Sequence, residues 1–187
     1  RKYYAPNNAC VAVAGDIDPA QTMEWVKKYF GPIPKGTDIE RPLPEPVSLS
    51  GETRIVMEDK IQLPRLYLVW PSVPRFTRED AALDVFTDVL STGKNSRLYK
   101  SLVFDKRIAQ SVSAYQDGSE IAGIAGIEVT AKPGRSLKEM EEAVNDILAA
   151  TPKDGITQKE VQAALNMKEA QFVNGLGTMF GKANALA

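Results

Sequence analysis

Apolar residues recur along this chain at helical spacing, and most of these stretches begin with a recognisable helix cap. Ser, Thr and Asp side chains accept hydrogen bonds from the free amides of a first helical turn, and a Glu or Gln three residues later can bond back. Such starts stand at Asp18, Thr77, Ser136 and Thr157. After Asp18, Pro19 fits the first helical position and Gly31 suits an end, so the pattern predicts a helix over residues 19–30.

Two helices are predicted after Thr77. The first has the i, i+3, i+4, i+7, i+8 spacing of a core-facing helix, in Ala82, Val85, Phe86, Val89 and Leu90. Gly93 ends it. Ser96 can cap a short second helix, in which Leu98 and Leu102 form an i, i+4 pair.

The last part of the chain is predicted to be helical as well. The helix after Ser136 has an apolar face that includes Met140 and Val144, and the helix after Thr157 runs to about Asn174. Another helical segment begins at Thr178 and is cut off at residue 187, so we expect the natural polypeptide to continue.

The strand-like stretches of the first half differ in pattern. Ala9–Ala14 is apolar on both faces, which predicts a central strand covered on each side. Glu52–Glu58 alternates, with Ile55 and Met57 on one side, which predicts a half-buried strand. Between them, the prolines of residues 32–46 resist helix and internal strand and predict a linker.

The remaining strands indicate the fold class. Leu66–Trp70 predicts a more buried strand, and residues 109–115 and 121–131 predict a β-hairpin around a turn at 116–119. Strands joined by turns and followed by paired helices indicate an α+β domain, an antiparallel β-sheet with helices packed on one face. A parallel doubly wound fold is disfavoured, because consecutive strands are joined more often by turns than by helices.

Composition excludes several function classes. The 187 residues include 23 Lys and Arg against 24 Asp and Glu, so no charge excess favours nucleic acid or a membrane surface. There is no histidine and a single cysteine, Cys10. A zinc site and a histidine-assisted Ser or Cys nucleophile therefore cannot be assembled from this chain. Because Cys10 lies in an apolar run, we expect a buried, inert thiol.

Several segments resemble a known family of peptidases. Residues 4–9 (YAPNNA), 13–19 (VAGDIDP) and 29–34 (YFGPIP) are similar to the segment that joins the two domains of a half-molecule in the M16 zinc peptidases, which include pitrilysin and the mitochondrial processing peptidase. Residues 96–102 (SRLYKSL) are similar to the signature helix of the second domain. In that family two halves close around a peptide chamber, and only one domain carries the zinc motif His-x-x-Glu-His.

The resemblance implies a domain organisation and a role. Residues 1–34 would be a strand and helix from the end of an upstream zinc domain, residues 35–50 a linker, and residues 51–187 the inactive second domain. This chain would then be the non-catalytic domain of a zinc metalloendopeptidase, lining the peptide chamber and contacting the partner half. Zinc and its activated water would belong to the missing domain, and this chain would hold no cofactor and be inactive alone.

The resemblance also implies partners and, less directly, a compartment. The partners are the upstream zinc domain, a second M16 half in the same or another chain, and a peptide substrate. No stretch is apolar enough to span a membrane. Bacterial relatives with similar segments are often exported, which favours the periplasm over the cytoplasm.

Two positions depart from the family's assisting half. Relatives of that kind place an arginine directly after the signature leucine and a tyrosine seven residues later, where they bind substrate. Val103 and Gln110 stand there in this chain, and the nearby Arg107 and Tyr115 are out of register. The segment is thus identified as the inactive domain attached to a zinc domain.

Lys94, Asn95, Ser96 and Arg97 are the candidate substrate- or partner-binding residues. They combine cationic and amide donors at a helix start, where a substrate carbonyl or an acidic partner could bind. The plainer interpretation is an ordinary loop and cap, with Arg97 packed against its own domain. Asp16 and Asp18 could ligate a metal, but a turn and a helix cap account for both.

Two other functions remain open on the sequence. The complete polypeptide could have lost its zinc motif and serve as a scaffold or assembly subunit, and the sequence upstream of Arg1 would decide between the two. A hydrolase based on two carboxylates is a remote alternative, because no pair of acidic residues is singled out.

Overall fold

A computed structural model of the chain describes residues 3–41, 45 and 47–187. The chain forms two compact units. One comprises Arg1–Pro42 together with Met167–Ala187, and the other comprises Leu43–Asn166.

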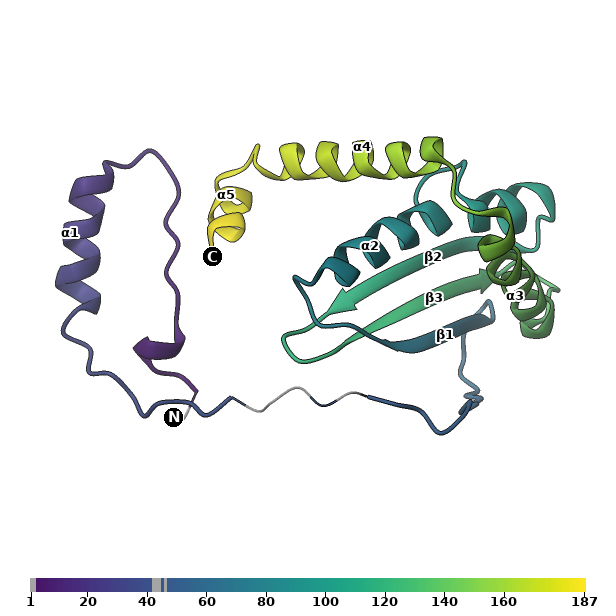
Figure 1. Cartoon of the computed structure of the whole chain (residues 1–187), viewed down its shortest axis with the longest axis horizontal. Helices are drawn as coiled ribbons and strands as arrows, with labels where there is room; N and C mark the ends of the chain where they lie inside the picture. Colours follow the sequence, from purple (N-terminus) through teal and green to yellow (C-terminus); the bar gives the residue numbers. More distant parts are fainter. Residues whose placement is uncertain (1–2, 42–44, 46) are drawn as a thin grey trace. The chain divides into compact units, whose positions relative to one another are not determined.

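The second unit is built on a three-stranded antiparallel sheet (Figure 1). Its strands are β1 (Arg65–Ser72), β2 (Ala109–Gly118) and β3 (Gly123–Ala131), in the order β1-β3-β2. The predicted hairpin is confirmed, but its turn lies later in the chain. Residues 116–118 continue β2, and the reversal is made where the Ser119 amide donates to the Ala122 carbonyl at 3.0 Å. The α+β prediction is confirmed.

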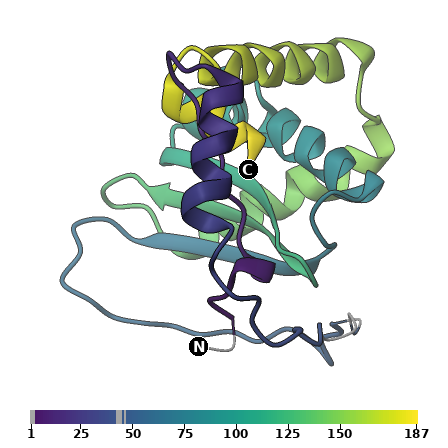
Figure 2. The ribbon, with the colours of Figure 1, turned by 90° about the vertical axis from the view of Figure 1, so that its left-hand side faces the viewer.

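Helices cover one face of this sheet. They are α2 (Arg78–Ser91), the π-helix η2 (Tyr99–Asp105) and α3 (Leu137–Asp154). Figure 1 shows α2 lying along β2, and in Figure 2 this teal helix lies on one side of the strands. The hydrophobic core lies between the helices and the sheet. Its largest fully buried side chains are Leu98, Leu102, Met140, Val129 and Val144.

The caps predicted at Asp18, Thr77, Ser136 and Thr157 are confirmed, and the one predicted at Ser96 is not. The carboxylate of Asp18 accepts from the Gln21 amide at 2.7 Å at the start of α1 (Pro19–Phe30). Thr77 and Ser136 cap α2 and α3 in the same way, at 3.1 and 3.2 Å. Each of these bonds involves residues three apart, so the sequence alone contains what the cap requires.

The first unit contains helices but no buried residue among those described. It includes a short 3-10 helix η1 (Pro6–Asn8), α1, the end of α4 (Gln158–Gly175), and α5 (Met179–Leu186). The strand predicted over Ala9–Ala14 is wrong for this structure: no described residue pairs with it. Cys10 is exposed, so its predicted burial is also wrong. A strand needs a neighbouring backbone, and the sheet lies in the other unit.

A second predicted strand is likewise absent. Residues 52–58 form no strand, and Ile55, Val56 and Met57 are 77, 78 and 85% exposed. The prediction was wrong because alternation supplies a suitable side-chain pattern but not a partner strand. The described residues of the Pro-rich stretch, which follows α1, form neither helix nor strand. Pro42, Pro44 and Pro46 lie outside the described residues. Across the described part of the chain, no helix is long and apolar enough to cross a bilayer.

Candidate functional site

The loop after α2 holds the four residues singled out by the sequence. Gly93 adopts φ of 84°, a left-handed value that favours glycine, and it lets the chain leave the helix. Lys94 and Asn95 are exposed, and Ser96 is buried. The Ser96 hydroxyl donates to the Gly93 carbonyl at 2.7 Å, so it closes the loop instead of accepting from a helical amide as predicted. The loop therefore presents Lys94 and Asn95 to solvent.

Arg97 turns away from this loop and into its own domain. Its guanidinium donates to both carboxylate oxygens of Glu160, from Nε at 2.7 Å and from Nη2 at 2.9 Å. Nη2 also donates to the Gly155 carbonyl at 2.5 Å. The two side chains are only 18 and 29% exposed. A forked, partly buried pair of this kind fixes the start of α4 against the segment that leads into η2.

Glu160 completes the start of α4 through Thr157. Its carboxylate accepts from the Thr157 amide and hydroxyl, both at 2.8 Å, and the Thr157 hydroxyl accepts from the Glu160 amide at 3.3 Å. This is the capping box predicted from the sequence. The Arg97 guanidinium, with the Thr157 donors, lowers the pKa of Glu160 to about 2 although burial opposes the shift. The same contact raises the pKa of Arg97.

The positions that align with the family's assisting pair do not form a polar site. Val103 lies in η2 and packs against the core, half-buried. Gln110 is exposed at the start of β2, where the pairing with β3 shifts register. Arg107 is exposed with φ of 55°, and Tyr115 lies further along β2. The structure brings none of them together with Arg97.

A surface that sequence analysis missed is the uncovered face of the sheet. Leu66 and Leu68 pack on the core, so Tyr67 and Val69 point to the opposite face, where they are 56 and 48% exposed. Ile124 on β3 is directly opposite Pro71 and is 44% exposed. Only the pairing of strands distant in sequence places these side chains on one surface, so no local pattern could have found it.

Tyr115 and Gly126 shape the middle of this uncovered face. A side-chain carbon added at Gly126 would lie 2.4 Å from the ring of Tyr115, so the tyrosine crosses β3 at the residue that has no side chain. Val69 is the partner of Gly126 on the other strand. The uncovered face is thus mixed: apolar side chains lie around Gly126, and Ser111, Ser113 and Thr130 lie on the same face toward one end, with an Arg65–Glu128 ion pair of 3.2 Å.

The described part of the chain shows no metal site beside these features. Among the described residues there is no group of three or more His, Cys, Asp or Glu side chains placed to hold a metal ion. Asp18 is accounted for as a helix cap. With no histidine in the sequence, the residues of this chain do not fit a peptidase zinc ion.

Comparisons with known proteins agree in pointing to one family. The family model described as peptidase M16 inactive domain matches residues 1–168. A zinc protease, PqqE, from Helicobacter pylori is 30% identical over 182 residues, which cover 93% of this chain and 40% of that protein. An uncharacterized zinc protease, YmxG, from Bacillus subtilis is 28% identical over 170 residues, with 89 and 39% covered.

Solved structures show the same fold. The crystal structure of a protease from Helicobacter pylori matches with a TM-score of 0.81 at 25% identity, over 98% of this chain and 45% of that one. A peptidase M16 inactive domain from Pseudomonas fluorescens matches with a TM-score of 0.63 at 21% identity, over 83% of this chain and 37% of that one. The chain therefore spans less than half the length of these similar proteins.

Proposed function

Because this chain belongs to the peptidase M16 inactive-domain family, we propose that it is the non-catalytic domain of a zinc metalloendopeptidase, lining a peptide chamber and contacting the partner half. The inactive half-domain implies a partner domain, in the same chain or another. The relatives' greater length supports a partner in the same polypeptide. The zinc ion would lie in that other domain.

The uncovered sheet face is the observation that carries the chamber role. Tyr67, Val69 and Ile124 expose apolar surface on a sheet whose other face is packed with helices. A contiguous apolar patch on a protein surface marks a binding surface more often than an isolated exposed residue does. Such a surface can contact peptide side chains of varied shape, because apolar contacts do not require a particular hydrogen-bonding pattern in the peptide.

The assignment of residues 1–34 to an upstream domain fits the burial pattern. In the proposed arrangement residues 1–34 complete the upstream domain, residues 35–50 are the linker, and residues 51–187 form the inactive domain. None of the described residues before 42 is buried, and Ala9–Ala14 has no strand partner there. Both observations are expected of a segment whose packing surface lies in another domain.

The loop at residues 94–97 has a divided role in this proposal. Lys94 and Asn95, which are exposed, would contact the substrate or the partner half. Arg97 is already engaged by Glu160, so it would position the loop and not bind a ligand itself. Ser96 would do the same through its bond to Gly93.

A substitution on the uncovered face tests the chamber role in the full-length protein. Tyr67→Glu should lower kcat/KM for an unfolded peptide by ~10-fold, since a charge replaces an apolar contact. Lys138→Glu is the matched control, because Lys138 is 84% exposed on α3 in the helical layer. Equal activity of the two variants, with unchanged unfolding midpoints, would contradict the chamber role.

A metal measurement tests where the zinc lies. Residues 1–187 alone should contain no stoichiometric zinc by elemental analysis and should cleave no peptide. The full-length protein should contain zinc and cleave. Stoichiometric zinc in the 187-residue chain, or metal-dependent cleavage by it, would overturn the assignment of the metal to another domain.

A further inference from the structure

The outer edge of β1 has unpaired backbone groups. The Ala131 amide donates to the Pro64 carbonyl at 3.0 Å, which sets the alternation of the β1–β3 ladder. Residues 66, 68 and 70 then bond toward β3, while Arg65, Tyr67 and Val69 point their backbone groups outward. No described residue bonds to the backbone groups of these three. Pro71, which has no amide to donate, also stands at an outward position, as prolines of edge strands do.

The other edge of the sheet is occupied at one residue, Ala114. The Ser91 hydroxyl at the end of α2 accepts from the Ala114 amide at 2.7 Å and donates to the Ala114 carbonyl at 3.3 Å. These bonds interrupt the row of outward backbone groups on β2. Open edges invite pairing with another strand, and β1 offers the uninterrupted row.

A strand-forming segment lies next to β1 in sequence. Residues 53–57 (TRIVM) are rich in residues that favour strands, and three consecutive apolar side chains, Ile55, Val56 and Met57, are more than three-quarters exposed. The connection to β1 already contains a reversal, in which the Ile61 amide donates to the Asp59 carbonyl at 2.9 Å. A tethered segment has a large advantage over any free peptide, because its effective concentration is high.

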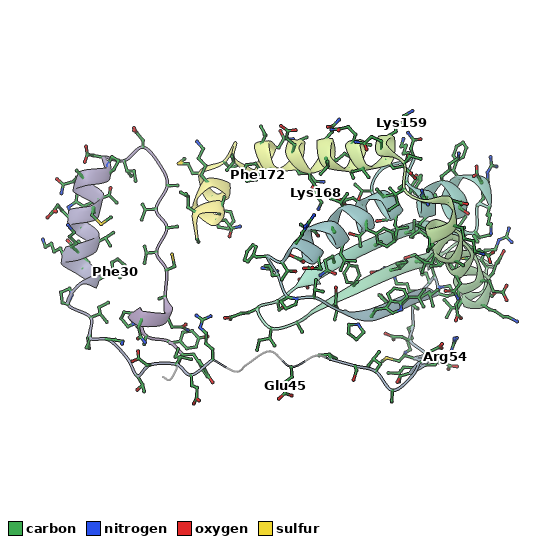
Figure 3. All side chains as sticks on the ribbon, viewed as in Figure 1. Phe30, Glu45, Arg54, Lys159, Lys168 and Phe172 are labelled. Carbon is green, nitrogen blue, oxygen red and sulfur yellow. The ribbon has the colours of Figure 1, made fainter. Side chains whose placement is uncertain are left out.

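An ion pair holds this segment elsewhere. The Arg54 guanidinium donates to both oxygens of Glu141 on α3, from Nη1 at 2.9 Å and from Nη2 at 2.6 Å. Figure 3 labels Arg54 in this segment. Docked with Ile55 and Met57 on the core side, next to Leu66 and Leu68, the segment would turn Arg54 to the uncovered face, away from α3. In this register the ion pair and the docked strand exclude one another.

We propose that residues 53–57 are a strap that docks on the open edge of β1 as a fourth strand, and that the Arg54–Glu141 ion pair holds the strap off that edge. The occupant of the edge is this segment of the same chain. Docking would bury two of the three exposed apolar residues and pair the outward amides of Tyr67 and Val69. It would also close the edge of the proposed peptide-binding face to other strands.

Hydrogen exchange on the full-length protein tests the strap. Glu141→Gln should slow exchange of the Tyr67 and Val69 amides about fivefold, since an exposed ion pair opposes docking only weakly. Glu142→Gln is the matched control: it removes a neighbouring carboxylate that pairs with Lys138 at 3.8 Å and not with Arg54. Unchanged exchange in Glu141→Gln would overturn the proposal.

A second set of variants identifies the occupant. Adding Ile55→Lys and Met57→Lys to Glu141→Gln should restore fast exchange, because both lysines would have to enter the core side. The two side chains are exposed when the strap is undocked, so the variant keeps its fold. Val56→Lys, which faces solvent when docked, should leave the protection intact. Protection that survives the double lysine change, or that rises with protein concentration, would mean that another strand fills the edge and would overturn the proposal.

Discussion

The two compact units use the same helix-starting chemistry and differ in burial. Asp18 caps α1 in the first unit, and Ser136 caps α3 in the second, each through an amide three residues on. Both helices have an apolar stripe. Met140 in the stripe of α3 is fully buried, whereas Met23 in the stripe of α1 is 53% exposed, and Phe30 at the end of α1 is 49% exposed (Figure 3).

The difference separates what a helix needs from what a core needs. A cap is satisfied by residues three apart, so α1 begins correctly without tertiary support. Burial needs a facing surface, and α3 finds one in the sheet. The apolar stripe of α1 has no such surface among the described residues of its own unit. It is therefore the part of the chain whose stability should depend most on the proposed upstream domain.

The largest expected effect on stability comes from truncating a methionine to alanine in each of the two helices. Met140→Ala should lower the free energy of unfolding by about 3 kcal/mol, because it leaves a cavity in the core. Met23→Ala should change it by less than about 0.5 kcal/mol, as exposed substitutions do. Urea denaturation of the 187-residue chain measures both. A comparable loss in Met23→Ala would show that α1 is packed against a facing surface within this chain.

The Arg97–Glu160 pair should have the next largest effect. Arg97→Ala leaves a partly buried carboxylate unpaired and should cost about 2 kcal/mol, less than for a fully buried pair because both side chains retain some exposure. Lys94→Ala, three residues away and exposed, is the control and should cost less than about 0.5 kcal/mol. Equal midpoints for the two variants would contradict a structural role for Arg97.

The same pair predicts a pH dependence. The pKa of Glu160 is about 2 in the folded chain, below its ordinary value near 4.5. A lowered pKa stabilises the fold above the ordinary value, and that contribution is lost as the pH falls toward the folded value. The stability difference between the wild type and Arg97→Ala should therefore be constant from pH 7 to about 5 and shrink below pH 4.5. A difference that does not change down to the acid limit of the fold would exclude the carboxylate as its source.

Removing the caps should have a smaller effect, and a different one in each unit. Ser136→Ala should lower the free energy of unfolding by about 1 kcal/mol, because α3 is part of the core. Asp18→Ala should reduce helical circular dichroism by the contribution of α1 and leave the unfolding midpoint of the core unchanged. A shift of that midpoint by Asp18→Ala would mean that the two units unfold together.

The sequence predicted what depends on neighbouring residues and missed what depends on distant ones. The starts of α1, α2 and α3 and the β2–β3 hairpin were correct, since caps and hairpins are local. The strands expected at residues 9–14 and 52–58 were wrong, because an apolar or alternating pattern does not provide the partner strand. At the candidate site the sequence offered two interpretations of Arg97, and the structure shows the one in which it packs against its own domain; its partner Glu160 could not be identified, because it lies sixty-three positions later in the chain.

Cys10 gives the last and smallest prediction, one with no expected change in stability. Its thiol is exposed in the 187-residue chain, where the sequence predicted burial in a central strand. A water-soluble disulfide reagent should therefore label it at the rate of an unfolded control. If residues 1–34 complete an upstream domain, the same thiol in the full-length protein should react at least ~10-fold more slowly, because pairing and packing block its access. Slow labelling of the 187-residue chain would mean that residues 9–14 find a partner within it. Equally fast labelling of both proteins would contradict the assignment of residues 1–34 to the upstream domain.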